Sequence, residues 1–288
     1  MRKAVLGIIG GSGLYQIEGL SDVEHVAVET PFGAPSDRIA VGVLRGTPVA
    51  FLPRHGAGHT IAPTEVNSRA NIWALKSLGV THVLAVNACG SLREELRPRD
   101  VVIPSQLIDF TRFRANTFFG RGIVAHIGFA EPFCPQFSRL VAEAARQVGT
   151  ATVHEGATFL TIEGPRFSTK AESHMFRSWG ADIIGMTASP EAQLAREAEL
   201  CYASLALVTD YDVWHESEEP VSVEAVVANL RANTALAKQA IANLAAMFPV
   251  ERTCACGEAL KNAIITDPAR IPEERKRELA LLLGKYLR

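Results

Sequence analysis

The 288-residue sequence lacks several features that would place it in a protein class at once. Its 29 Lys and Arg against 31 Asp and Glu leave a formal charge of −2 with no basic block, which argues against a dedicated nucleic-acid or membrane-surface binder. Five cysteines are too few for a disulfide scaffold and leave one unpaired, so a reducing compartment is expected. No run of about 20 apolar residues is present to span a membrane.

Two further absences concern export and hydrolase chemistry. The apolar run at residues 4–9 is interrupted by glycines and is too short for a signal peptide, so a cytoplasmic location is expected. No Gly-x-Ser-x-Gly motif is present to anchor serine-hydrolase chemistry. The hydrophobic fraction of 48% is too high for a disordered chain and is sufficient for a large core.

Short apolar runs alternate with helical patterns, which is typical of an α/β fold whose sheet is covered on both faces. The predicted strands are 4–10, 39–43, 49–52, 81–87, 100–104, 157–163, 182–186 and 203–209. The predicted helices are 64–78, 138–148, 222–247 and those that begin at the Thr169 capping box and at Ser189-Pro190. We predict one α/β domain over residues 1–248 and a tail over 249–288 that docks on it.

Two of the strand ends are suited to an anion. The glycine-rich turn at residues 7–13 can direct several backbone N–H groups at one anion, and Ser12 adds a hydroxyl donor. The turn fails as a dinucleotide fingerprint because glycine is missing where the pattern requires it, and a plain strand-to-helix turn is the alternative. Arg54 and His55 follow another apolar strand, where a planar guanidinium suits phosphate; a surface ion pair is the alternative.

A pair of aspartates, Asp210 and Asp212, follows the strand at 203–209. On an extended segment two such carboxylates project to one face, and their repulsion can raise one pKa and provide a proton donor. The alternative is a loop in which aspartates bond to local backbone groups. Two further strands are followed by small polar residues, at positions 87–91 and 185–187. Polar residues at five strand ends together favour one convergent site.

No metal site is predicted. Cys254-Ala-Cys256 has no second ligand pair at zinc spacing and no nearby histidine. His55 and His59 would need a third ligand that the sequence does not indicate.

The chain resembles the 5′-methylthioadenosine phosphorylases of the trimeric purine nucleoside phosphorylase family. The matching stretches lie at 7–14, 30–36, 54–60, 71–76, 88–94, 130–134, 162–168, 171–173, 179–182 and 209–214. The resemblance implies one domain with a central mixed, largely buried sheet flanked by helices, and a helical tail. It also implies a transferase in which phosphate attacks the anomeric carbon of a nucleoside and releases the purine, with phosphate as co-substrate and no cofactor.

The resemblance also assigns site residues. The phosphate site would hold Ser12, Arg54, His55, Asn87, Ala88 and Thr187. The nucleoside site would hold Met186, Phe167, Ser168, Asp210, Asp212, Val221, Val223, Val227 and the partner subunit's His126, with ordinary helix core as the alternative for the valines. Asp210, supported by Asp212, is the expected proton donor to the purine N7. An ionised carboxylate accepts from a 6-amino group and repels a 6-oxo group, so the pair predicts adenine.

One residue departs from the family pattern, because methylthioadenosine phosphorylases commonly have threonine where this chain has Asn87. A broad-specificity purine nucleoside phosphorylase or a methylthioinosine phosphorylase therefore stays open, as does a non-catalytic nucleoside-binding sensor. The resemblance further implies a homotrimer or a dimer of trimers, and a role in purine and methionine salvage. In thermophilic relatives the cysteines that match Cys134 and Cys201 can form a disulfide, and Cys254 could bond to Cys256.

Overall fold

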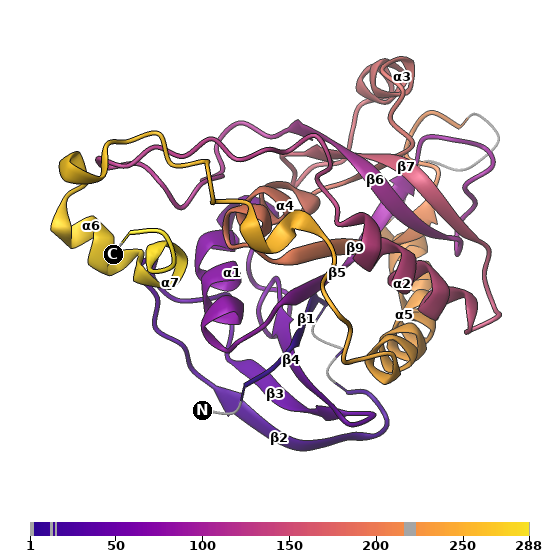
Figure 1. Cartoon of the computed structure of the whole chain (residues 1–288). Coiled ribbons are helices and arrows are strands. Elements are labelled where there is room, and N and C mark those ends of the chain that lie inside the picture. Colours follow the sequence, from indigo (N-terminus) through magenta and orange to yellow (C-terminus); the bar gives the residue numbers. More distant parts are fainter. Residues whose placement is uncertain (1–2, 12–13, 15, 216–222, 288) are drawn as a thin grey trace.

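The centre of the molecule is a mixed β-sheet. A computed structural model describes residues 3–11, 14, 16–215 and 223–287, and within them nine strands pair in the order β2-β3-β4-β1-β5-β8-β7-β6-β9 (Figure 1). The strand β5 also pairs with β9, so the strands β5 to β9 close into a ring from which β1 to β4 extend. The strands β1, β4, β5 and β9 run parallel to their neighbours in this set, so their carboxyl ends lie along the same edge.

Each predicted strand is present, and several are longer than predicted. The bounds are β1 (Leu6–Gly10), β3 (Ile39–Leu44), β4 (Thr47–Pro53), β5 (His82–Ser91), β6 (Val101–Phe110), β7 (Val153–Ile162), β8 (Ile183–Gly185) and β9 (Cys201–Asp210). The polar residues 87–91, expected in a loop after the strand, instead continue β5: residues 87–90 pair with β9, and residues 90–91 pair with β8. The edge strand β2 (Leu20–Val26) was not predicted, because it lies largely in solvent and has no apolar run.

The helices follow their capping residues. They are α1 (Ser68–Ser77), α2 (Pro135–Arg146), α3 (Lys170–Ser178), α4 (Ala188–Glu197), α5 (Val223–Ala246), α6 (Glu273–Glu278) and α7 (Ala280–Leu283). The capping box at Thr169 is confirmed, since its hydroxyl accepts from the backbone N–H of Glu172, whose carboxylate accepts from the N–H of Thr169. The predicted helix at 64–78 is divided into a short 3₁₀ turn, η1 (Pro63–Glu65), and α1.

Two sets of helices cover the sheet and bury its apolar side chains. Residues of α1 and α4 share one core cluster with strand residues, and residues of α2 and α5 share a second cluster. Because helices pack on both faces, the strands near the centre are buried along almost their whole length, as in β1 and β9. This explains why their sequences are continuously apolar rather than alternating.

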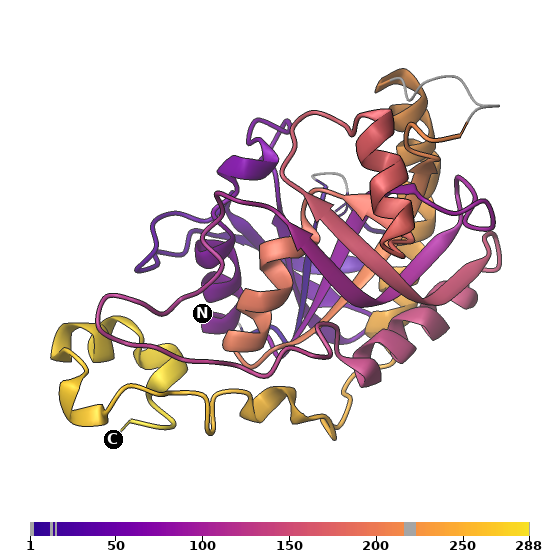
Figure 2. The same cartoon turned by 90° about the horizontal axis from the view of Figure 1, so that it is seen from above.

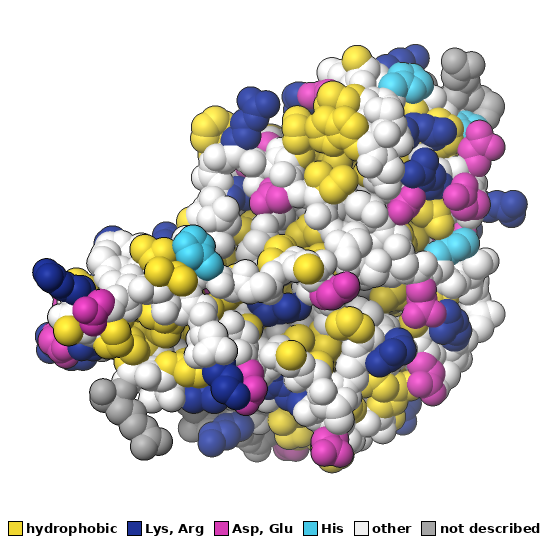
Figure 3. Space-filling view, turned by 45° about the horizontal axis from the view of Figure 1, so that its top comes forward, with side chains coloured by type: hydrophobic (Ala, Val, Ile, Leu, Met, Phe, Trp, Pro, Cys, Tyr) yellow, Lys and Arg dark blue, Asp and Glu magenta, His cyan; other side chains and the backbone are white. Residues whose placement is uncertain are grey.

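The tail after α5 runs along the outside of this α/β unit, where it is drawn in yellow (Figures 1 and 2). It contains the 3₁₀ turns η2 (Ala255–Glu258) and η3 (Pro268–Arg270), then α6 and α7. Leu260, Leu279 and Leu283 are buried in the same core cluster as α1 and α4, so the tail docks through its apolar side chains. None of the described helices has the length and apolar character that crossing a bilayer requires. Acidic and basic side chains are interspersed over the face in Figure 3.

Candidate active site

A cavity of about 530 Å³ opens where the parallel strands end. Gly11 follows β1, Arg54 and His55 follow β4, and Ala88 lies near the end of β5, and all of them line the cavity. Asp210 ends β9 and lines it too. This volume is in the range of sites for small ligands, and the carboxyl ends of strands are where open α/β sheets bind them.

Arg54 is buried beside the cavity and held by an acidic partner. Its Nε donates to Glu191 Oε1 at 2.5 Å, and its Nη2 donates to Glu191 Oε2 at 3.1 Å. The Val86 carbonyl accepts from Nη1 at 3.0 Å and the Ile9 carbonyl from Nη2 at 3.3 Å. Burial disfavours the charged guanidinium, but the Glu191 carboxylate outweighs it and raises the pKa of Arg54. The ion pair considered for Arg54 therefore exists, but in the interior rather than at the surface.

His55 lies next to Arg54 and is uncharged near neutral pH. Burial, followed by the positive charge of Arg54, lowers its pKa to about 4. Its Nδ1 lies 2.9 Å from the Ile61 carbonyl, which can only accept, so Nδ1 carries the proton. The other ring nitrogen, Nε2, is then an acceptor. A neutral imidazole of this tautomer can accept a hydrogen bond from a protonated oxygen of phosphate.

Asn87 lies behind the cavity wall rather than in it. It is buried in β5, where its Nδ2 donates to Thr187 Oγ1 at 2.7 Å and its Oδ1 accepts from Ser204 Oγ at 2.8 Å. Thr187 and Ala88 line the cavity, whereas Asn87 is absent from its lining. The amide therefore orients the Thr187 hydroxyl.

The two aspartates line the cavity together, although not in the predicted way. Asp210 ends β9, but Asp212 has a φ of 51° in the turn that follows, so the segment is not extended. Burial, rather than repulsion between the two, is the main cause that raises the pKa of each carboxyl, and the charge of Asp210 adds a smaller effect on Asp212. A raised pKa makes a carboxyl a better proton donor at neutral pH.

Hydrogen bonds fix the side chain of Asp210. Its Oδ1 accepts from the backbone N–H of Asp212 at 2.8 Å, and its Oδ2 lies 2.6 Å from the hydroxyl of Thr209. That hydroxyl has one hydrogen and a second acceptor within reach, the Cys89 carbonyl at 3.1 Å. The Thr209 hydroxyl can therefore donate either to Asp210 Oδ2 or to the Cys89 carbonyl. A Cβ at Gly90 would lie 2.9 Å from Asp210 Oδ1, so this approach requires glycine.

Further polar atoms lie beside the aspartates. Asp212 Oδ2 and Ser168 Oγ are buried, and hydrogen bonds from Ser173 and Ser168 to the Asp212 carboxyl offset part of the rise in its pKa that burial causes. Both residues line the cavity, together with Met186 and Phe167, whose side chain is 43% exposed. This end of the cavity therefore combines polar and apolar side chains, which is suited to a ligand with its own donors and acceptors.

Two supporting residues were not found from the sequence. Glu191 holds Arg54, and its Oε2 also accepts from the Tyr202 hydroxyl at 3.0 Å. Arg114 donates from Nε to Glu163 at 2.9 Å, and its other N–H groups donate to the carbonyls of Met186, Ser189, Ile162 and Glu163. The position of Glu191 in the first turn after Ser189-Pro190 was visible, but its partner is 137 residues away.

Some predicted residues are not tested by this arrangement. Ser12 and Val221 lie outside the described residues, and the side chains of Val223 and Val227 are likewise not described in α5. His126 has an exposed side chain, and its backbone N–H donates to the Ala263 carbonyl. It does not line this cavity, whose lining comes from one chain.

Comparisons with known proteins agree on one family for this chain. A model of the phosphorylase superfamily matches residues 5–246. The S-methyl-5′-thioadenosine phosphorylase of Geobacter sulfurreducens is 56% identical over 286 residues, which cover 99% of this chain and 100% of that protein. A solved methylthioadenosine phosphorylase from an Antarctic soil metagenomic library has a TM-score of 0.94 and 48% identity, with 98% of this chain and 100% of that one covered.

A further relative is informative about residues 12 and 87. The solved adenosine/methylthioadenosine phosphorylase of Schistosoma mansoni has a TM-score of 0.82 and 41% identity, with 90% of this chain and 97% of that one covered. That structure is a double variant, S12T and N87T, in complex with adenine. The unaltered protein therefore has serine and asparagine at its own positions 12 and 87, as this chain has.

Proposed function

The chain belongs to the phosphorylase superfamily, and from this premise we propose that it catalyses the phosphorolysis of 5′-methylthioadenosine to adenine and 5-methylthioribose 1-phosphate. One observation carries the proposal. A single cavity is lined by a buried arginine with a neutral histidine and a threonine, which suit phosphate, and by two buried carboxyls with raised pKa values, which suit a purine.

The reaction replaces one bond to the anomeric carbon with another. A phosphate oxygen forms a bond to C1′ while the bond from C1′ to purine N9 breaks, and the electron pair of that bond stays with the purine. The sugar carries positive charge in the transition state, and the neighbouring phosphate anion stabilises it. Arg54 fixes the phosphate by charge, with hydrogen bonds to Thr187 and to Nε2 of His55.

The leaving purine must gain a proton. Asp210 donates it to N7 in this proposal, and the Thr209 hydroxyl and the Asp212 N–H, which donate to its two oxygens, hold the carboxyl in place and stabilise the anion that remains. In its ionised form the same group accepts from a 6-amino substituent, which favours adenine over 6-oxopurines. Asp212 Oδ2 and Ser168 Oγ provide further polar groups for the nucleoside. These side chains and phosphate account for every proton and bond, so we propose that no organic cofactor takes part.

The second candidate function is phosphorolysis of a broader range of nucleosides. Asn87 and the Schistosoma mansoni protein, which is named as acting on adenosine as well as methylthioadenosine, favour use of adenosine beside methylthioadenosine. A broad purine nucleoside phosphorylase or a methylthioinosine phosphorylase would instead process 6-oxopurines at comparable rates.

We further propose a homo-oligomer, a trimer or a dimer of trimers, in which the partner subunit's His126 completes the 5′ pocket. The loop 111–134 supports this, because Phe113 is 87% exposed and Val124 is 48% exposed on it. In such an assembly a neighbouring subunit would cover these apolar side chains. The cytoplasmic location and the role in purine and methionine salvage complete the proposal.

The test is a substrate panel assayed with and without phosphate. We expect phosphate-dependent release of adenine from methylthioadenosine, faster than base release from inosine or guanosine. Equal or reversed rates would remove the adenine assignment. Base release that does not require phosphate would indicate a hydrolase, and binding without any turnover would indicate a sensor.

A further inference from the structure

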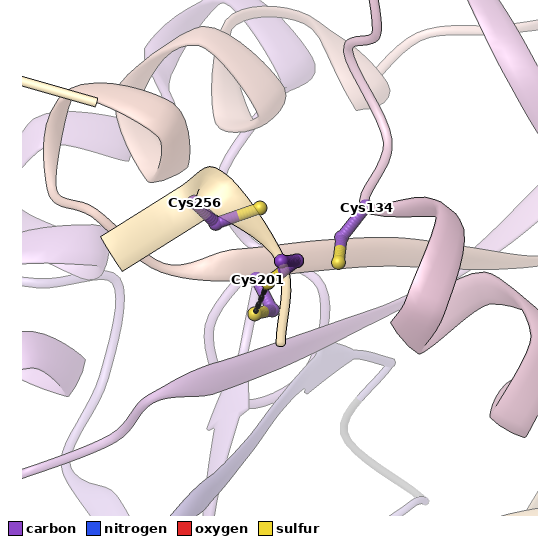
Figure 4. Close-up of side chains that lie close together, drawn as sticks. Cys134, Cys201 and Cys256 are labelled. Atoms are coloured by element: carbon purple, nitrogen blue, oxygen red, sulfur yellow. Dashed lines mark hydrogen bonds between the residues drawn. The ribbon is translucent and has the colours of Figure 1, made fainter. Parts of the chain in front are cut away.

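Four of the five cysteines lie together, far along the chain from one another. Cys134 directly precedes α2, Cys201 begins β9, and Cys254 and Cys256 flank Ala255 at the start of η2. Since Asp210 ends the strand that Cys201 begins, the cluster is at the opposite end of β9 from the candidate active site. Figure 4 shows the side chains of Cys134, Cys201 and Cys256 close together.

The spacing of the sulfur atoms is that of a metal centre. All four Sγ atoms lie within 4.8 Å of one another, and those of Cys201 and Cys254 are 3.3 Å apart. In a tetrahedral zinc site with Zn–S bonds of about 2.3 Å, neighbouring sulfur atoms are about 3.8 Å apart. One ion at the centre of the cluster can therefore reach all four ligands with small adjustments.

The surroundings are suited to the charge of such a centre. Four thiolates around a divalent ion carry a net charge of −2, which needs a positive neighbour in a buried place. The guanidinium of Arg252 lies against Cys201 and Cys254, and its Nε is buried without a hydrogen-bond partner among the described residues. Cys134 stands at the N-terminus of α2, where the helix dipole favours a thiolate.

We propose that Cys134, Cys201, Cys254 and Cys256 bind one structural Zn²⁺ that fastens the tail to the core. Four thiolates and no open position make a closed, structural site rather than a catalytic one. The sequence predicted no metal because Cys254 and Cys256 had no second ligand pair, and the fold supplies that pair from α2 and β9.

Binding requires no redox partner. Four S–H bonds lose their protons to solvent, and four Zn–S bonds form, so no electrons are transferred. Two disulfides, the competing arrangement, would remove four electrons from the same thiols and would need an oxidant. In a reducing compartment the zinc form is therefore favoured.

The zinc site would hold the tail in place, and the tail in turn contacts the loop 111–134. Beyond η2, Ile264 pairs with Ala125 in an isolated β-bridge, and Arg275 donates to the Phe118 carbonyl at 3.1 Å. These contacts support the loop that holds Arg114 and His126. Losing the metal should therefore loosen this side of the molecule while leaving the strand ends at the cavity in place.

The test measures metal in the full-length protein purified under reducing conditions. Elemental analysis should find about one zinc per chain in the wild type, as a closed four-cysteine site requires. Cys254→Ser and Cys256→Ser should retain less than about a fifth of it and should melt roughly 10 °C lower. The matched control is Ala255→Ser, which adds a hydroxyl to the same turn and keeps all four thiols; it should bind zinc as the wild type does.

A second measurement does not depend on how the variants fold. A mercurial thiol reagent added to the wild type should release its zinc to a colorimetric indicator, and alkylation after denaturation should modify all five cysteines. Iron instead of zinc would overturn the assignment of the ion. A chain without metal, whether with five free thiols or with a mass four hydrogens lower because of two disulfides, would overturn the site.

Discussion

Glu191 and Arg54 form a two-point ion pair in the interior, with Nε–Oε1 at 2.5 Å and Nη2–Oε2 at 3.1 Å. Their side chains are 1% and 4% exposed, respectively. The Tyr202 hydroxyl and the carbonyls of Val86 and Ile9 complete the set of contacts. Four of the five N–H groups of the guanidinium are thereby committed, so Glu191 sets the orientation in which Arg54 faces the cavity.

Removing Glu191 should therefore affect both stability and phosphate binding. Glu191→Ala leaves a buried charge without its partner, which should lower the free energy of unfolding by about 3–5 kcal/mol. Glu191→Gln keeps the shape, and because Arg54 loses its two-point partner, KM for phosphate should rise by roughly tenfold while KM for the nucleoside changes little. Urea unfolding and steady-state kinetics measure the two effects.

An exposed ion pair provides the control for Glu191. Arg146 and Glu155 also form a salt bridge, but both side chains are more than a third exposed. Glu155→Gln should change the unfolding free energy by less than about 1 kcal/mol and leave both KM values unchanged. If Glu191→Gln behaves as Glu155→Gln does, Glu191 does not position Arg54 for phosphate.

Asp210→Asn tests the assignment of the proton donor. An amide cannot transfer a proton to N7, so kcat for methylthioadenosine should fall by about 10²-fold or more. It can, however, donate to a 6-oxo group, so the ratio of 6-aminopurine to 6-oxopurine turnover should fall as well. Kinetics with methylthioadenosine and inosine measure both. Asp267→Asn, an exposed carboxylate in the tail, should alter neither; an unchanged ratio in Asp210→Asn would remove Asp210 from the specificity argument.

Asn87→Thr separates phosphate binding from base selection. Asn87 bonds to Thr187 and Ser204 and does not line the cavity, so its replacement should act through the Thr187 hydroxyl. We expect KM for phosphate to change several-fold, with the ratio of adenosine to inosine turnover unaltered. A changed base ratio with constant KM for phosphate would contradict this role.

The strands and the polar strand ends followed from the sequence because both depend on local patterns. Continuous apolar runs indicated buried strands, and the residues after them had to meet at one edge of a parallel set. The edge strand β2 was missed because its side chains are largely in solvent and leave no such pattern. The length of β5 was underestimated because pairing with β9 and then with β8, rather than apolar character, continues it to Ser91.

The partners of the site residues did not follow from the sequence. Arg54 follows β4 and meets Glu191 of α4, and Cys201 of β9 meets Cys254 of the tail, so each contact joins segments that are far apart in the sequence. Spacing along the sequence carries no trace of such contacts. Similarly, burial is the main cause of the raised pKa values of the two aspartates, whereas the sequence suggested repulsion between them as the cause.

Arg114→Lys tests whether the loop 111–134 supports the nucleoside site. All five N–H groups of Arg114 have acceptors, among them the Met186 and Glu163 carbonyls, and lysine can satisfy at most three. KM for the nucleoside should rise by roughly tenfold, with KM for phosphate nearly unchanged. Arg112→Lys, an exposed neighbour that retains its charge over the Phe110 ring, should behave as the wild type. Equal increases in both KM values would indicate general loosening instead.

His55 should make stability depend on pH in the acidic range. Its pKa is lowered to about 4 in the folded protein, against an ordinary value of 6.5. Between these values the unfolded chain binds a proton that the folded protein does not, so this contribution to stability falls as the pH decreases from about 6.5 to 4. Urea unfolding at several pH values should show a shallower slope for His55→Asn than for the wild type. His174→Asn, which removes an exposed histidine from α3, should leave the slope as it is; an equal slope in all three proteins would mean that His55 is protonated as readily in the folded state as in the unfolded chain.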